Sequence, residues 1–353
     1  MNPFYNHEEK RLRALWRLIL QTVLFLTGIF LMSVLVGASV AAIKLSQGEI
    51  NLDMMSDPQT ASNLIMDSIG GWGQAFISLG MVVLMVLIFL IAGKFLDKRK
   101  FADFGFHFSK LWWKDFGFGL FLGGILMLFI FVVELAFGWV KVTGFMNNLS
   151  LVPFLGGILT ALVTFISVGI YEEMLSRGYH LRNMAEGLNW KIFGARGGLW
   201  LGYIISSSIF GLLHATNENA TIISTFNLVI AGLFLGLGYI LTGELGLSIG
   251  LHMTWNFFQG NVFGFPVSGS SIGTSLINIE QSGPNLLTGG AFGPEAGLIG
   301  IIAILIGSLL TVLYVRKTRG HARVCYDLAQ YKKPGAALVA ETVNQDQTAV
   351  IEV

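Results

Sequence analysis

The stretch Leu18–Ile43, LILQTVLFLTGIFLMSVLVGASVAAI, decides the class of fold. It contains no charged side chain over 26 residues. A helix needs about 20 apolar residues to cross the hydrocarbon core of a bilayer, so this run is long enough to span. It is too long for the ~7–15-residue apolar core of a signal peptide, and no clear small-residue cleavage site follows it. We therefore interpret it as a retained transmembrane anchor, and as helical because backbone groups in lipid must bond within the segment.

Seven further apolar runs follow along the chain, of which the fourth and sixth are short: Trp72–Gly93, Phe116–Trp139, Leu151–Glu172, Leu199–Leu213, Ile222–Leu241, Gly246–Phe258 and Leu298–Val315. Apolar residues make up 54% of the 353 residues and charged residues only 12%, against about 25% in soluble domains. The mean hydropathy is +0.68. The sequence therefore predicts an all-α, polytopic membrane helix bundle with about eight transmembrane helices.

The distribution of basic residues predicts an orientation. With eight spans, twenty of the 22 Lys and Arg fall on one side of the membrane, and only Lys44 and Lys141 fall on the other. The positive-inside rule then places both termini in the cytoplasm. The net charge of +1 gives no basic field for binding nucleic acid. The single cysteine, Cys325, excludes an internal disulfide and a Cys-based metal cluster.

Ionisable residues inside spanning segments are costly, and they are candidates for function. The fourth segment ends in Glu172-Glu173-Met174-Leu175-Ser176-Arg177. Glu173 and Arg177 are four residues apart, so a helix places them on one face as an ion pair. A structural Glu–Arg pair at the membrane interface explains Glu173 and Arg177, but it does not explain the adjacent carboxylate, Glu172. A carboxylate in a low-dielectric site has a raised proton affinity, which suits Glu172 to act as a general base and then as an acid.

Two further clusters carry polar side chains at a spacing of four. Phe210 and His214 end the fifth segment, and His252 and Asn256 lie within the seventh. Taken alone, the first is more simply a helix cap and the second a polar clamp between helices. Taken together with the Glu pair, they supply a base, a group that positions water and donors for an oxyanion.

Other arrangements are less favourable for catalysis. Gly246-Leu247-Ser248-Ile249-Gly250 matches Gly-x-Ser-x-Gly, but it opens a membrane helix and does not follow a strand, as a nucleophile elbow must. Ser206–Ser208 lie in an apolar run and favour helix packing. Glu134, in the third segment, belongs to none of the clusters, and we interpret it as a carboxyl that hydrogen-bonds between helices.

The order and spacing of the three clusters resemble the CAAX protease and bacteriocin-processing family (CPBP, also called Abi). That family carries Glu-Glu-x-x-x-Arg, then Phe-x-x-x-His, then His-x-x-x-Asn, and all three motifs are complete here. The turn Thr242–Leu245 is similar as well. The resemblance covers roughly residues 150–260 and implies an intramembrane endopeptidase of the CAAX type, related to the eukaryotic CAAX prenyl protease.

The resemblance also implies roles for the residues. Glu172 and His214 would activate a water, and His252 and Asn256 would stabilise the oxyanion. Glu173, Arg177 and Phe210 would support the site. We expect no cofactor, with zinc as the alternative, because a Glu/His/His set can bind zinc but no HExxH spacing makes a compact site. The three motifs should converge within the membrane at a cavity facing the cytoplasm.

Two readings other than a peptidase remain open. The first is a non-catalytic scaffold or bacteriocin-immunity or regulatory protein of the same family, which would function without Glu172. The second is a transporter, which should show an internal repeat; the polar clusters are instead confined to the second half. The partners expected are the lipid bilayer and a membrane-associated protein or peptide substrate of unspecified sequence.

The organisation of the chain follows from these assignments. Residues 1–150 are expected to hold transmembrane helices 1–3, residues 151–260 the family-like catalytic core, residues 261–320 an outer loop and the last transmembrane helix, and residues 321–353 a cytoplasmic tail. The stretch Gly260–Gly293 contains no Lys or Arg. The tail after Lys333 is expected to be disordered. The expected location is the plasma membrane of a prokaryote.

Overall fold

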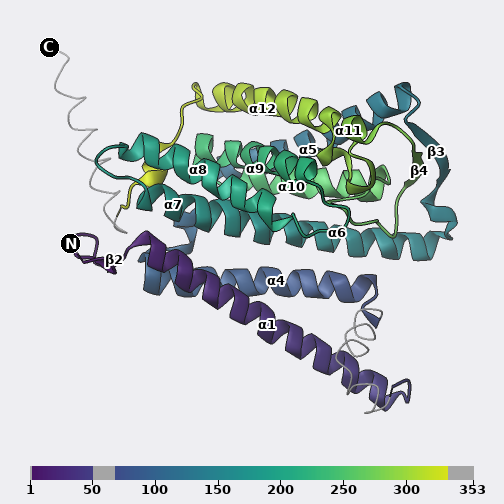
Figure 1. The fold of residues 1–353 in the computed structure, drawn as a ribbon, viewed down its shortest axis with the longest axis horizontal. Coiled ribbons are helices and arrows are strands. Elements are labelled where there is room, and N and C mark those ends of the chain that lie inside the picture. The colour runs from purple at the N-terminus through teal and green to yellow at the C-terminus, as the bar shows by residue number, and fades with distance from the viewer. Residues whose placement is uncertain (1, 51–67, 333–353) are drawn as a thin grey trace.

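The computed structural model describes residues 2–50 and 68–332, and in this part of the chain all eight predicted segments are helical (Figure 1). The corresponding helices are α1 (Ala14–Ser46), α4 (Gly71–Ala92), α5 (Lys110–Ala136), α6 (Leu151–Glu173), α8 (Gly194–Leu213), α9 (Ile222–Thr242), α10 (Gly246–Phe257) and α12 (Leu298–Arg319). They form a bundle in which α12 lies along one side and α1 along the other, with α4 between α1 and the remaining helices. The prediction of a polytopic helical bundle is confirmed. The predicted tail beyond residue 332 lies outside the described residues.

Within residues 2–50 and 68–332, six helical segments are long and apolar enough to cross a membrane, so the chain is an integral, multi-pass membrane protein: Ala14–Ser46, Gly71–Asp97, Lys110–Ala136, Leu151–Gly187, Ile222–Thr242 and Leu298–Arg319. The two remaining predicted spans, α8 and α10, are helices of 20 and 12 residues. Helix α10 is buried without interruption from Gly246 to Met253. A helix enclosed in this way is surrounded by protein, which allows it to carry polar side chains at membrane depth.

Helix α6 continues beyond the Glu pair. A π-helical stretch, Met174–Leu181, follows it directly, and α7 (Arg182–Gly187) follows the π-helix. Together they form one apolar helical segment of 37 residues. Glu172 therefore lies in the middle of a long segment and not at its end. The turn between Leu188 and Phe193 leads directly into α8, so no separate interfacial helix precedes that span.

Glycines bring α5 and α10 into backbone contact. A Cβ on Gly123 would lie 2.6 Å from the Leu251 carbonyl oxygen and 2.7 Å from the Trp255 nitrogen. A Cβ on Gly250 of α10 would lie 2.3 Å from the carbonyl oxygen of Phe116. Small residues allow this approach between membrane helices, where van der Waals packing replaces the hydrophobic effect as the driving force. The contact fixes α10, and with it His252, against the bundle.

We expect Gly123→Ala to destabilise the protein by about 1–3 kcal/mol, because the added methyl group must displace the backbone of α10. Gly117→Ala, on the same helix, is the matched control, since a Cβ there meets no atom within 4 Å. That substitution should be neutral or slightly stabilising, because alanine favours helix over glycine. Thermal unfolding in detergent measures both variants. Equal unfolding midpoints for the two would contradict the close packing.

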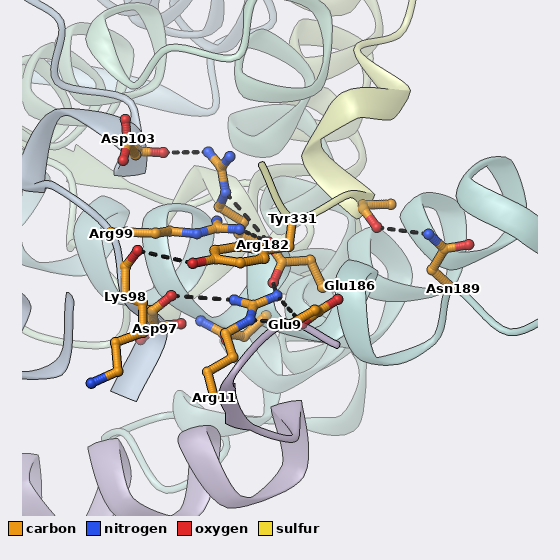
Figure 2. Close-up of polar contacts among 12 residues, drawn as sticks. Glu9, Arg11, Asp97, Lys98, Arg99, Asp103, Arg182, Glu186, Asn189 and Tyr331 are labelled. Atoms are coloured by element: carbon orange, nitrogen blue, oxygen red, sulfur yellow. Dashed lines mark hydrogen bonds and ion pairs between the residues drawn. The ribbon is translucent and has the colours of Figure 1, made fainter. Parts of the chain in front are cut away.

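A buried ion-pair cluster joins the N-terminal segment, the end of α4 and α7 (Figure 2). The Glu186 carboxylate receives Arg11 at 2.8 Å and Arg17 at 3.2 Å, and it also pairs with Arg99. Arg17 additionally reaches Asp97 at 3.0 Å. Breaking a buried pair by removing one partner typically costs about 3–5 kcal/mol. The cluster therefore anchors α1, which otherwise diverges from the bundle (Figure 1).

The segment after α10 is more ordered than a Gly- and Ser-rich loop suggests. Strand β3 (Val140–Phe145) pairs antiparallel with β4 (Ile277–Gln281), and the short helix α11 (Asn285–Thr288) follows. Gln281 of β4 donates a hydrogen bond of 2.8 Å to Glu134. Glu134 thus connects α5 to a strand. The prediction that it hydrogen-bonds to another helix is wrong.

Candidate active site

The three motifs converge on one cavity. Its volume is about 710 Å³, and its lining includes Glu172, His214, His252 and Asn256. These side chains come from α6, from the residue that ends α8 and from α10. Glu172 can line the same cavity as His214 because α6 runs on into α7, so Glu172 lies near the middle of this helical segment and not at its end.

A buried network of charged side chains supports the site. The Glu173 carboxylate is fully buried, and its Oε1 accepts from Arg177 at 2.7 Å and from His252 Nδ1 at 2.8 Å. Arg177 also donates to the carbonyl oxygen of Gly232 at 2.8 Å. Its guanidinium lies over the Phe210 ring, 4.6 Å from the ring centre, as a cation–π contact. Members of all three motifs thus contact one another, and two of them, Phe210 and His252, also line the cavity.

This network orients His252. With Nδ1–H donated to Glu173, the ring is fixed and Nε2 is directed toward Glu172, as a carboxylate partner commonly fixes a functional imidazole. The distance from Nε2 to Glu172 Oε2 is 3.9 Å. This is too long for a direct hydrogen bond but short enough for a water to bridge. The Glu172 side chain is 23% exposed, whereas Glu173 is not exposed at all. The two adjacent carboxylates therefore occupy different environments.

His214 and Asn256 complete the lining near Glu172. The His214 Nδ1 lies 2.8 Å from the carbonyl oxygen of Phe210, to which it donates, so Nε2 remains an acceptor. Asn256 lies one turn beyond His252 on α10. No described residue bonds to the Asn256 amide, which leaves its NH2 group available to a ligand in the cavity.

The His and Glu side chains of the cavity are of types that can bind zinc. Catalytic zinc takes three protein ligands at about 2.0–2.2 Å in addition to water. Within residues 2–50 and 68–332, no group of three or more His, Cys, Asp or Glu side chains is placed to hold a metal ion. Glu173 Oε1 is already bound by Arg177 and His252. The arrangement does not fit a three-ligand zinc site.

The lining of the cavity continues to Val267, Ser268, Ser270 and Glu295, which belong to the segment between α10 and α12, and none of the described lining residues is Lys or Arg. The opening of the cavity toward the cytoplasm stays a prediction. Sequence reasoning also missed Glu295; the signal was a lone carboxylate in a Gly-rich stretch just before an apolar span.

Comparison with known families agrees with the motifs. Residues 154–258 match the family model described as Type II CAAX prenyl endopeptidase Rce1-like. The matched stretch is less than a third of the chain and contains all three motifs. Neither the curated proteins nor the solved structures contain a match to this chain. The resemblance drawn from the motifs is therefore confirmed: residues 154–258 form an Rce1-like domain of the CAAX protease family within a multi-pass membrane protein.

Proposed function

We propose that this protein is an intramembrane endopeptidase that hydrolyses a peptide bond of a membrane-associated or lipidated protein or peptide, using a water activated by Glu172. One observation carries the proposal. Glu172, His214, His252 and Asn256 line a single cavity inside a membrane protein, and a buried ion-pair network orients one of them. Such an arrangement supplies a base, a group that positions water and oxyanion donors in one cavity.

The first step forms the tetrahedral intermediate. A water lies between Glu172 and His214, where it donates one hydrogen bond to the carboxylate and one to His214 Nε2. Glu172 takes a proton from this water as its oxygen attacks the scissile carbonyl carbon. The carbonyl oxygen becomes an oxyanion that accepts hydrogen bonds from His252, as the imidazolium, through Nε2–H and from the Asn256 amide.

The second step breaks the peptide bond. The oxyanion re-forms a carbonyl, the carbon–nitrogen bond breaks, and Glu172 returns its proton to the leaving amine. The products are a carboxylic acid and an amine, and Glu172 is restored as a carboxylate. Glu173 and Arg177 do not react in this scheme; they hold Nδ1–H of His252, so that Nε2 faces the cavity throughout.

The location of the protein follows the charge pattern. We place it in the plasma membrane of a prokaryote with both termini in the cytoplasm, because nearly all Lys and Arg then lie on the inner side. Accessibility labelling of single cysteines introduced at Glu8 and Glu280, in a Cys325→Ser background, tests this orientation. The N-terminal site should be protected in intact cells and the site on β4 should be labelled.

The test of the proposal is cleavage of a library of membrane peptides by the purified protein in liposomes, with and without 1,10-phenanthroline. Cleavage by the wild type that resists the chelator is the expected result, because the site does not offer three ligands to zinc. Loss of cleavage on chelation, restored by zinc, would contradict the glutamate mechanism. If the wild type cleaves no peptide but binds a membrane partner, the result would favour the non-catalytic scaffold.

A further inference from the structure

A carboxylate occupies the far end of the cavity. Glu295 lies in the 3-10 turn Pro294–Ala296, immediately before α12, and it lines the same cavity as Glu172. Its side chain is 4% exposed. The residue lies outside the stretch 154–258 that matches the CAAX protease family, so no part of the proposed hydrolysis uses it.

The partners of Glu295 are all neutral. Its Oε1 accepts from the Ser268 backbone nitrogen at 2.6 Å and from the Ser268 hydroxyl at 3.3 Å, and its Oε2 accepts from the Gln259 amide. The backbone nitrogen of Glu295 donates to the same carboxylate, so its hydrogen bonds all come from neutral donors, and none of them brings a positive charge. Among the described residues, no Lys, Arg or His pairs with it. Burial without a cation raises the pKa of Glu295 to about 7.

Buried charges are normally paired, because desolvation of an unpaired ion costs several kcal/mol. Glu295 has no such partner among the described residues, so a cation that pairs with its ionised form must come from outside them. The cavity is the route by which such a group would arrive. Much of its lining is apolar and includes Val168, Phe234, Trp255 and Ile304. Apolar walls leave the carboxylate at one end as the feature that discriminates between charged and uncharged groups.

The turn beside Glu295 is rigidly held. Val267 and Ser270 bond to each other on both sides of a two-residue turn, in which Ser268 has φ +48° and Gly269 has φ +90°. Asn217, three residues after His214, donates to the Ser268 carbonyl oxygen at 2.8 Å. This contact ties the far end of the cavity to the loop that carries His214. A fixed distance between the two ends is what a specificity subsite requires.

We propose that Glu295 is a specificity-determining residue that binds a lysine or arginine side chain of the substrate, at a fixed number of residues from the bond that Glu172 hydrolyses. This inference rests on the proposed function. The substrate cation and the carboxylate lose their water together and gain a charge-assisted hydrogen bond in a low-dielectric site. A substrate with an uncharged residue at that position leaves Glu295 unpaired.

The test scans a cleaved membrane peptide with Lys, Arg, Met and Gln at each position. The wild type should favour Lys or Arg at one position by at least about tenfold in kcat/KM, since close charge pairs contribute more than 1.4 kcal/mol. Glu295→Gln should lose this preference while it cleaves the Met peptide at a similar rate. A preference that survives in Glu295→Gln, or its absence in the wild type, would overturn the proposal.

Two variants separate recognition from a purely structural role. Ser268→Ala removes one hydroxyl contact but keeps the carboxylate, so it should retain the preference. Glu295→Asp also keeps the charge and should retain part of it, which covers the case in which Glu295→Gln does not fold. If both charged variants lost the preference while their unfolding midpoints matched that of the wild type, recognition would not depend on the carboxylate.

Failure of the proposed function is distinguished by measuring binding. Fluorescent Lys and Met peptides are bound to Glu172→Gln and to the double variant Glu172→Gln/Glu295→Gln, neither of which needs to cleave. Tighter binding of the Lys peptide to the first protein alone supports the subsite even if no cleavage is ever detected. Equal binding of the two peptides to Glu172→Gln rejects it.

The pH dependence provides an independent readout. The pKa of Glu295 is raised to about 7, so the carboxylate is ionised, and able to bind a cation, above that pH. KM for the Lys peptide should fall as pH rises through about 7, and KM for the Met peptide should not. Glu172, His214 and His252 share the cavity, and Glu218 lies in the adjoining loop, so the comparison of the two peptides at each pH removes their common effect. Identical profiles would contradict the assignment.

Discussion

Glu172→Gln is expected to lower kcat/KM by about 10²–10⁴-fold, with an unchanged unfolding midpoint. Glutamine has almost the same shape as glutamate, but its amide cannot take a proton from water. The side chain is 23% exposed in the cavity and has no ion pair shorter than 3.9 Å in the described residues, so its neutralisation breaks no buried bond. The measurement is single-turnover cleavage of a membrane peptide together with thermal unfolding.

The control for this substitution is Glu218→Gln. Glu218 is an exposed carboxylate in the loop after His214 and is not part of the cavity lining. Glu218→Gln removes the same charge a short distance from the site, and this substitution should leave kcat/KM unchanged. Equal cleavage by wild type and Glu172→Gln would remove Glu172 from the mechanism. Equal loss in both variants would mean that general charge, and not a base at Glu172, controls the rate.

Arg177→Met is expected to destabilise the protein by about 3–5 kcal/mol and to abolish cleavage. The substitution leaves the fully buried Glu173 carboxylate without its cation and removes the bond to the Gly232 carbonyl oxygen. It also weakens the support of His252, because the same carboxylate oxygen binds Arg177 and His252 Nδ1. Unfolding by denaturant in mixed micelles measures the first effect.

A second substitution separates stability from catalysis. Glu173→Gln/Arg177→Met removes both charges of this ion pair, so neither of them is left without the other, and much of the lost stability should return. Activity should not return, because a neutral amide no longer holds His252 as a carboxylate does. If Arg177→Met alone is as stable as the wild type, the Glu173–Arg177 pair does not stabilise the fold. Recovery of activity in the double variant would show that His252 needs no carboxylate.

Several features of the fold could be predicted from the sequence. The uncharged run Leu18–Ile43 and its seven successors located every long helix, because a bilayer requires uninterrupted apolar segments. The pairing of Glu173 with Arg177 followed from their spacing of four, since a helix stacks such residues. The sequence also shows arginines at the ends of the spanning segments, but it did not predict that three of them bind Glu186.

Other features depended on contacts between distant segments. The spacing of residues did not predict that Glu173 binds His252, 79 residues away, or that Glu134 binds Gln281, 147 residues away. The depth of Glu172 was ambiguous, because hydropathy cannot tell whether a helix continues through charged residues when those residues are buried in protein. Here α6 passes into a π-helix and α7, and the charges of Arg182 and Glu186 are enclosed.

The sequence by itself determined that this is a multi-pass helical membrane protein, and it determined which polar residues lie in its helices. Both properties are local, because apolar length and helical spacing act within about twenty residues. Only the tertiary structure decided which of those residues meet in one cavity and that Glu295 lines the same cavity. These depend on the packing of α10 through glycine contacts and on the fold of the segment before α12, where interactions join residues far apart in the chain.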